Sequence, residues 1–311
     1  MTLMKNHAAV REASGSCFII QLQNYAIDTV LLDNAANLVV TFEPMDRWKT
    51  LGPHRKGWGI DFLQDLGCSV MAVMCQQNDW YRKPDLLDFF IQMNKSGFFH
   101  GFEQVMTYGG SMGGYGALAY ADAVNADVVL SINPQATLSE RLAPWETRFS
   151  QGKKQHWEGP FANAADGFRK VSAAYVAYDP FLPLDVRQVK LLKIGNPQLV
   201  ELKIPVVGHH LPKWMMEMDI LKSTVQAIVT GQFSEKCFYQ AARKRRLIKR
   251  YWKMLVTKPR VLKSPLFTGI VLRYAEHYGF SLSGKTFKPS ESPPNAGLTV
   301  SRDAGPGNER R

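Results

Sequence analysis

Short apolar runs alternate with segments of helical periodicity over residues 38–230. The apolar, β-branched runs predict buried strands at residues 38–42, 69–75, 105–108, 126–132, 171–178 and 199–204. The spacing between them predicts helices at residues 60–66, 84–90, 112–122, 186–192 and 213–230. Strands that are apolar at every position suit a parallel sheet covered on both faces. The pattern therefore predicts an α/β fold with a doubly wound, mostly parallel sheet.

A glycine-rich turn joins one predicted strand to the helix after it. It reads Gly109-Gly110-Ser111-Met112-Gly113, the G-x-S-x-G pattern that places a nucleophilic serine on a sharp strand-to-helix turn. Glycines suit such a turn because the backbone angles are unusual and no room is left for β-carbons where strand and helix nearly touch. Ser111 is therefore the candidate nucleophile.

A serine hydroxyl becomes a good nucleophile when an imidazole takes its proton and a carboxylate orients that imidazole. In an open sheet, these groups should lie beyond the carboxyl ends of later strands. Asp179 and His209 both follow predicted strands, and they occur after Ser111 in the order acid, then histidine. Asp185 is the alternative acid and His210 the alternative base.

These motifs resemble those of the α/β-hydrolase superfamily over roughly residues 37–232. Residues 109–113 are similar to its nucleophile elbow, 179–183 to its acid loop and 208–209 to its histidine loop. The resemblance implies a serine hydrolase that cleaves or transfers an ester-linked acyl group through a Ser-Asp-His triad and an acyl-enzyme. Residues 111–115, with Trp80 and Tyr81, also resemble hydrolase-fold proteins that act on acyl groups of bacterial surface glycans. The implied substrate is a small-molecule or glycan acyl ester.

The developing oxyanion needs two backbone N–H donors. The first is Met112, directly after the nucleophile, and the second should come from the loop after residues 38–42. Pro44 has no N–H, which leaves Phe42, Glu43 or Met45, and position favours Glu43. The acidic side chain of Glu43 must then turn away from the oxyanion.

Composition narrows the setting of this chemistry. With 45% hydrophobic and 21% charged residues, the chain has the balance of a soluble globular protein, and no apolar run approaches the ~20 residues that cross a bilayer. The first residues carry no apolar signal segment, so we expect a cytoplasmic protein. The four cysteines are scattered without metal-ligand spacing, so we expect no metal and no cofactor.

Most of the formal charge of +11 is concentrated in one segment. Residues 234–263 hold eleven Lys or Arg against a single acid, Glu235. We therefore expect a hydrolase domain at 1–232 with an irregular insertion at 134–168 as a candidate cap, a basic helical extension at 233–280 and a disordered tail at 281–311.

The basic extension suggests a second function. Aromatic and aliphatic residues recur at near-helical spacing among the cations of residues 236–263, so this segment could pack on the domain or bind an anionic membrane surface or an acidic polymer. No motif for specific nucleic-acid binding is present. The alternative to an enzyme is thus a non-catalytic hydrolase-fold adaptor that binds an anionic partner through this helix.

Overall fold

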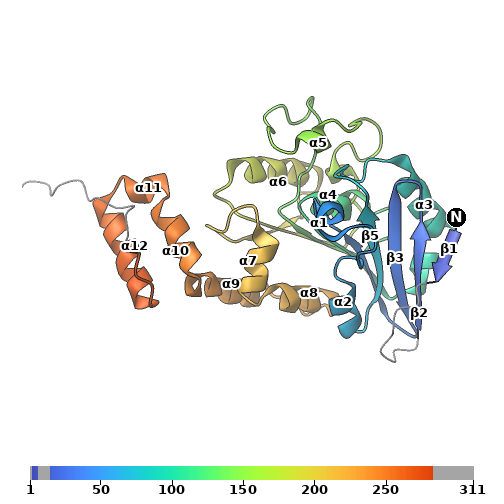
Figure 1. The fold of residues 1–311 in the computed structure, drawn as a ribbon, viewed down its shortest axis with the longest axis horizontal. Helices are drawn as coiled ribbons and strands as arrows, with labels where there is room; N and C mark the ends of the chain where they lie inside the picture. Colours follow the sequence, from blue (N-terminus) through green and yellow to red (C-terminus); the bar gives the residue numbers. More distant parts are fainter. Residues whose placement is uncertain (1, 6–14, 283–311) are drawn as a thin grey trace, which may run out of the picture. The chain divides into compact units, whose positions relative to one another are not determined.

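Nine strands form one sheet within the residues that the computed structural model describes, 2–5 and 15–282 (Figure 1). The strands are β1 (Thr2–Lys5), β2 (Gly15–Gln21), β3 (Tyr25–Leu32), β4 (Asn37–Phe42), β5 (Ser69–Cys75), β6 (Gln104–Gly110), β7 (Val128–Ile132), β8 (Ala173–Tyr178) and β9 (Val200–Lys203).

The strand order is β1-β2-β3-β5-β4-β6-β7-β8-β9. The strands from β5 to β9 in this order run parallel, and β1, β2 and β3 continue the sheet as antiparallel strands. Every residue of β5 and β7 is buried, as expected for apolar strands covered on both faces. The predicted doubly wound, mostly parallel sheet is confirmed.

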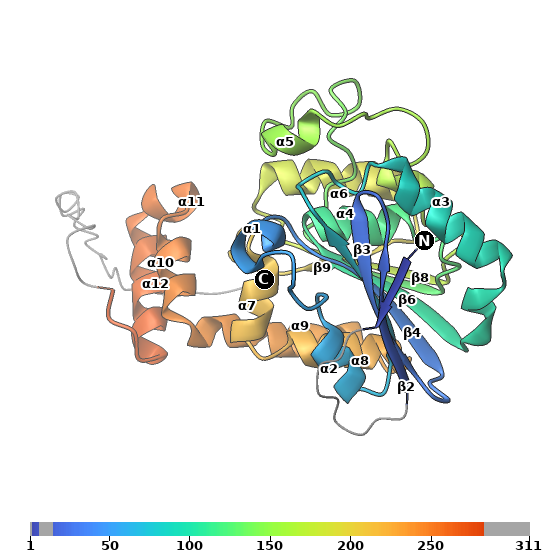
Figure 2. The ribbon, with the colours of Figure 1, turned by 45° about the vertical axis from the view of Figure 1, so that its right-hand side comes forward.

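Helices cover both faces of the sheet (Figure 2). One face carries α3, α4 and α6, and the other carries α2 and α8. The helical elements are α1 (Arg47–Leu51), α2 (Ile60–Asp65), α3 (Pro84–Lys95), η1 (Phe98–Gly101), α4 (Met112–Ala119), α5 (Ser150–Lys153), η2 (Ala164–Asp166), α6 (Pro183–Gly195), α7 (Leu211–Glu217), α8 (Leu221–Val229), α9 (Glu235–Ala242), η3 (Arg243–Leu247), α10 (Lys249–Val256), α11 (Pro259–Leu262) and α12 (Pro265–His277).

The C-terminal part divides at a different residue from the one that composition suggests. The chain forms two compact units, residues 1–254 and 255–311. Phe238 and Trp252 are buried, and the Tyr239 hydroxyl donates to the carbonyl of Glu201 at 3.0 Å and accepts from the Lys203 N–H at 3.1 Å. The Tyr239 contacts, together with the ion pair of Arg250 with Glu217 at 2.9 Å, attach α9 and the start of α10 to the first unit.

The basic segment is not one continuous helix. Helix α9 passes into the short 3₁₀ helix η3, and Ile248 is extended before α10 begins. The second unit contributes α11 and α12. The expected tail lies almost wholly in residues 283–311, outside the described part of the chain. Among the described residues, none of the helices combines the length and the apolar character needed to cross a membrane.

Candidate active site

Ser111 occupies the tight turn between β6 and α4. Its φ of 53° and ψ of −116° are unusual for a residue with a β-carbon, and its N–H donates to the carbonyl of Ile132 at 2.8 Å. A β-carbon on Gly109 would lie 2.0 Å from the Gly113 carbonyl oxygen, and one on Gly113 would lie 2.0 Å from the Phe42 carbonyl oxygen. Only glycine fits at these two positions, so the motif is required by the close approach of α4 to β6 and β4.

His209 lies directly beside the candidate nucleophile. Its Nε2 is 3.2 Å from Ser111 Oγ, although the two residues are 98 positions apart in the chain. It sits in the loop between β9 and α7, directly after Gly208, whose φ is 73°. His210 is exposed. The structure thus brings together the serine and the histidine that the sequence singles out.

The carboxylate beside His209 belongs to Asp185. Its Oδ2 is 2.9 Å from His209 Nδ1, and the residue is 1% exposed in the first turn of α6. Burial alone would raise the pKa of Asp185, but hydrogen bonds and charge from His209 and Arg148 outweigh burial and lower it. Asp185 is therefore held in its ionised form, as a partner for imidazole must be.

Asp179 has a different role from the one expected, because its carboxylate is occupied by backbone N–H groups. It accepts from Phe181 at 2.9 Å, Val206 at 3.2 Å, Val207 at 2.8 Å and Gly208 at 2.7 Å. The prediction that Asp179 partners His209 is corrected in favour of Asp185. The buried carboxylate of Asp179 instead fixes the three residues that precede His209.

Met112 and Glu43 lie where the two oxyanion donors were expected. Met112 opens α4, and Gly113 packs against the backbone of Phe42 and Glu43, so the loop after β4 touches the elbow. Within the described residues, neither the Met112 N–H nor the Glu43 N–H has a hydrogen-bond acceptor. Both donors are thus unused in the structure.

The side chain of Glu43 is engaged in a buried ion pair. It accepts from Arg55 through both carboxylate oxygens and from the Cys75 N–H at 2.7 Å, and it is 2% exposed. Tyr81 donates its hydroxyl to the Glu43 carbonyl at 2.7 Å. The Arg55 guanidinium compensates the charge of this carboxylate, and the Cys75 N–H helps to orient it, so Glu43 does not present an unpaired charge beside the elbow.

Three residues that the sequence patterns do not single out contact the candidate base or acid. Arg148 Nη1 donates to Asp185 Oδ1 at 2.6 Å, and the Phe149 ring lies 5.7 Å from the His209 ring. Asn133 Nδ2 lies 3.2 Å from His209 Nε2 and 3.4 Å from Nδ1. Near-equal distances to both ring nitrogens place this amide over the ring face. The charged residues within the aromatic run 145–149 are the signal that could have pointed to Arg148.

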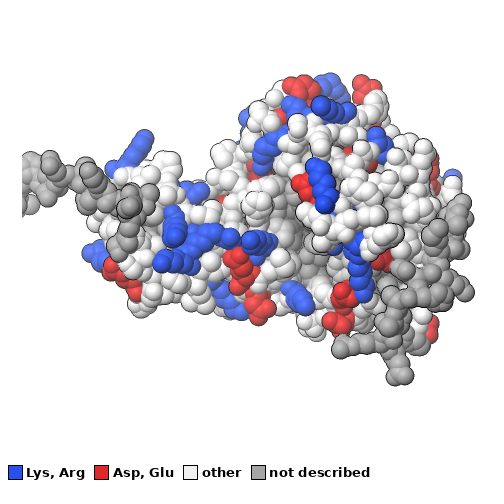
Figure 3. Space-filling model, viewed as in Figure 1, with Lys and Arg blue, Asp and Glu red and all other residues white. Residues whose placement is uncertain are grey.

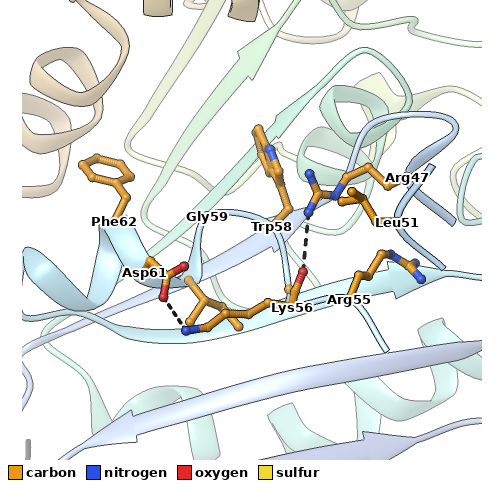
Figure 4. Close-up of a pocket in the computed structure, with 10 residues that line it drawn as sticks. Arg47, Leu51, Arg55, Lys56, Trp58, Gly59, Asp61 and Phe62 are labelled. Atoms are coloured by element: carbon orange, nitrogen blue, oxygen red, sulfur yellow. Dashed lines mark hydrogen bonds and ion pairs between the residues drawn. The ribbon is translucent and has the colours of Figure 1, made fainter. Parts of the chain in front are cut away.

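A separate pocket of about 450 Å³ lies between α1 and α2 (Figure 4). Its walls include Arg47, Arg55, Lys56, Trp58 and Phe62. Each of its three cations is paired with a carboxylate: Arg47 and Arg55 with Glu43, and Lys56 with Asp61. Its three cations are thus engaged by two carboxylates, with Arg47 and Arg55 sharing Glu43, and the candidate active site is defined by Ser111 and His209.

No group of three or more His, Cys, Asp or Glu in the described part of the chain is arranged to hold a metal ion. The four cysteines are free thiols.

No protein-family model and no curated protein matches this chain. Among solved structures, it is similar to a capsule O-acetyltransferase of Neisseria meningitidis serogroup A, at 12% identity and a TM-score of 0.47 over 70% of this chain and 98% of that one. It is also similar to an esterase of Pyrobaculum calidifontis, at 14% identity and a TM-score of 0.48 over 69% of this chain and 83% of the esterase. A fluorophosphonate-binding serine hydrolase of Staphylococcus aureus aligns at 11% identity and a TM-score of 0.45 over 71% and 98%.

The strand order β1-β2-β3-β5-β4-β6-β7-β8-β9, with the tight turn of Ser111 between β6 and α4, is that of the α/β-hydrolase fold. Ser111 follows β6, Asp179 and Asp185 follow β8, and His209 follows β9.

Proposed function

We propose that the protein is a serine hydrolase or acyltransferase that forms an acyl-enzyme on Ser111. The observation that carries the proposal is the continuous chain of contacts from Ser111 Oγ to His209 Nε2 and from His209 Nδ1 to Asp185 Oδ2, at 3.2 Å and 2.9 Å. A serine, an imidazole and an ionised carboxylate in this order form an activated nucleophile.

The geometry supports the following reaction. Ser111 Oγ attacks the ester carbonyl while His209 Nε2 takes the hydroxyl proton, and Asp185 stabilises the imidazolium through Nδ1–H. The N–H groups of Met112 and Glu43 receive the oxyanion. His209 then gives its proton to the departing alcohol, which leaves the acyl group on Ser111. Water, or the hydroxyl of a second substrate, attacks the acyl-enzyme by the same steps in reverse.

The proposed substrate is an acyl ester of a small molecule or a glycan. Hydrolysis and acyl transfer share the acyl-enzyme and differ only in the acceptor, so the same residues serve both. None of these steps uses a cofactor.

Covalent labelling with a fluorophosphonate tests the proposal before any substrate is known. The wild type should be labelled at Ser111 and should hydrolyse p-nitrophenyl esters across a series of acyl lengths, whereas Ser111→Ala should do neither. Ser96→Ala, which changes an exposed serine at the end of α3, is the matched control and should behave as the wild type. A wild type that takes no label would support the adaptor instead.

A second function is favoured by the charge of residues 236–253. Phe238, Tyr251 and Trp252 of this segment are buried, whereas Leu247 is exposed. Lys and Arg side chains gather on the visible face along α9 and α10 (Figure 3). The exposed cations are Lys236, Arg243, Lys244, Lys249 and Lys253. We propose that they attract an anionic membrane surface by charge alone.

Vesicle co-sedimentation tests this second function. Changing those five residues to Gln should weaken binding to anionic vesicles by more than a hundredfold, since each cation near lipid contributes about 1 kcal/mol. Binding of the wild type should fall with salt, because charges are screened within about 10 Å at 0.1 M. Equal, salt-independent sedimentation of the two proteins would contradict it, and binding to a soluble polyanion alone would point to an acidic polymer. The control changes exposed lysines elsewhere, Lys95, Lys154, Lys170 and Lys190, to Gln.

A further inference from the structure

The two carboxylate oxygens of Asp185 are divided between two partners. Oδ2 faces His209 Nδ1 at 2.9 Å, and Oδ1 accepts from Arg148 Nη1 at 2.6 Å. Asp185 is 1% exposed, so water does not replace either partner. Rotation of this carboxylate would break both contacts at once. The orientation of Asp185 toward His209 therefore depends on Arg148.

Arg148 is itself held by a second buried carboxylate. Its Nε donates to Glu146 Oε1 at 2.9 Å and its Nη2 to Glu146 Oε2 at 2.8 Å, which forms a planar two-point pair. Glu146 is fully buried, and it also accepts from Gln188 Nε2 at 3.1 Å. Gln188 lies one turn after Asp185 in α6, so the same helix supports both ends of the Asp185–Arg148–Glu146 chain.

Arg148 lies in the insertion at 134–168, and the next residue, Phe149, contacts His209. Phe149, with a φ of 60°, places its ring 5.7 Å from that of His209 and packs against Trp80 at 5.3 Å. The Arg148 guanidinium also lies 4.9 Å over the Phe149 ring. Two adjacent residues of the insertion thus contact the proposed acid and the proposed base.

We propose that Arg148 is a positioning residue that orients Asp185 toward His209 and sets the charge that the imidazole experiences. The catalytic effect of Arg148 rests on the proposed function, whereas its contacts with Asp185 and Glu146 do not depend on it. Arg148 does not touch Ser111 in the structure and acts through Asp185. The insertion therefore contributes a positioning residue to the proposed catalytic site.

The charged groups near His209 are Asp185, Glu146 and Arg148. Asp185 and Glu146 are negative and Arg148 is positive, so the three carry one net negative charge beside the imidazole. Among the described residues, the other hydrogen-bond and ring partners of His209 are uncharged: Ser111, Asn133 and Phe149. Lys153 donates to the Glu146 carbonyl and pairs with the exposed Glu140, so it is partly neutralised. A protonated His209 would bring the net charge of these four residues to zero.

Removing the charge of Arg148 and removing the charge of Glu146 should therefore shift the pH midpoint of His209 protonation in opposite directions. Arg148→Gln leaves two buried negative charges, so the imidazole should hold its proton to higher pH, by on the order of one pH unit. Glu146→Gln removes a negative charge, so the proton should leave at lower pH. Arg148→Lys keeps the charge but loses the two-point geometry, so the midpoint should stay near that of the wild type while Ser111 labelling slows about tenfold.

The measurement is an NMR pH titration of the His209 ring in the full chain, together with the pH dependence of fluorophosphonate labelling. Arg187→Gln is the matched control, since Arg187 stacks on Trp145 of the same insertion at 4.3 Å without contacting Asp185, and it should leave both midpoints unchanged. Circular dichroism establishes that each variant is folded; should Arg148→Gln not fold, Glu146→Gln and Arg148→Lys decide the question.

The inference is overturned if the His209 midpoint is unmoved in the folded Gln variants or moves in the same direction in both. It is also overturned if Arg148→Lys labels at the wild-type rate. Absence of labelling in the wild type would contradict the proposed function alone, because the titration of His209 does not depend on turnover.

Discussion

Asp185 Oδ2 lies 2.9 Å from His209 Nδ1, on the side of the imidazole opposite Ser111. Asp185→Asn should therefore lower the rate of ester hydrolysis by about 10³–10⁴-fold, because an amide no longer stabilises the imidazolium or selects the tautomer that accepts the serine proton. Steady-state kinetics on a p-nitrophenyl ester measures this. An Asp185→Asn enzyme within tenfold of the wild type would remove Asp185 from the triad.

Asp179→Asn should act mainly on stability. The carboxylate is fully buried and accepts from four backbone N–H groups, and an amide would present its own NH₂ to some of them. We expect the free energy of unfolding in urea to fall by about 2 kcal/mol or more. A folded, fully stable Asp179→Asn protein with the larger loss of activity would restore Asp179 as the acid.

Ser111→Gly should give a more stable protein than Ser111→Ala. The φ of 53° and ψ of −116° at this position are strained for any residue with a β-carbon, while glycine adopts them readily. The two inactive variants should differ by about 1 kcal/mol in the free energy of unfolding, with Ser111→Ala close to the wild type. Equal stability of both variants would mean that the elbow carries no strain.

Arg55→Ala should destabilise the protein strongly, by about 3–5 kcal/mol, because it removes the buried cation of Glu43 and leaves this carboxylate only the more distant and more exposed Arg47. The side chains of Arg55 and Glu43 are 3% and 2% exposed. Arg47→Ala provides the comparison, since Arg47 meets the same carboxylate at 3.4 Å with a side chain 25% exposed, and it should cost under about 1 kcal/mol. Chemical denaturation of the two variants would contradict this view if they lost the same stability.

Glu201 should make stability depend on pH in the acid range. Partial burial would raise its pKa, but hydrogen bonds from Lys193, Tyr178 and Lys203 outweigh burial and lower it to about 2. A carboxylate with a depressed folded-state pKa contributes stability above its unfolded pKa of about 4.3 and loses it as pH falls toward the folded value. Glu201→Gln should therefore cost about 1 kcal/mol at pH 7, after solvent screening, and progressively less between about pH 4 and pH 2. A difference from the wild type that does not vary with pH would contradict the assignment.

The elbow and the fold could be predicted because their signals are local. Each buried strand is a short apolar run, and Gly109 is needed by its contact with Gly113 within the turn itself. His209 was identifiable because it follows directly after the last strand and a glycine with positive φ. Such features depend on neighbours in the chain, so the sequence displays them.

The choice between Asp179 and Asp185 could not be made from the sequence. Both follow β8, and both are buried. What separates them is that the backbone of residues 206–208 folds onto Asp179 while His209 and Arg148 turn toward Asp185, contacts that span 24 to 37 positions for Asp185.

The domain boundary and the Arg148 chain were decided in the same way. Residues 236–253 look like a separate basic extension by charge, yet Tyr239 bonds to Glu201 and Arg250 pairs with Glu217, both within residues 1–254. Composition by itself indicated that residues 134–168 are irregular and that residues 234–263 are basic. Only the tertiary structure determined which carboxylate meets which cation. A buried charge pairs with the group that folding brings within hydrogen-bond distance, and the separation of two residues along the sequence does not give their distance in space.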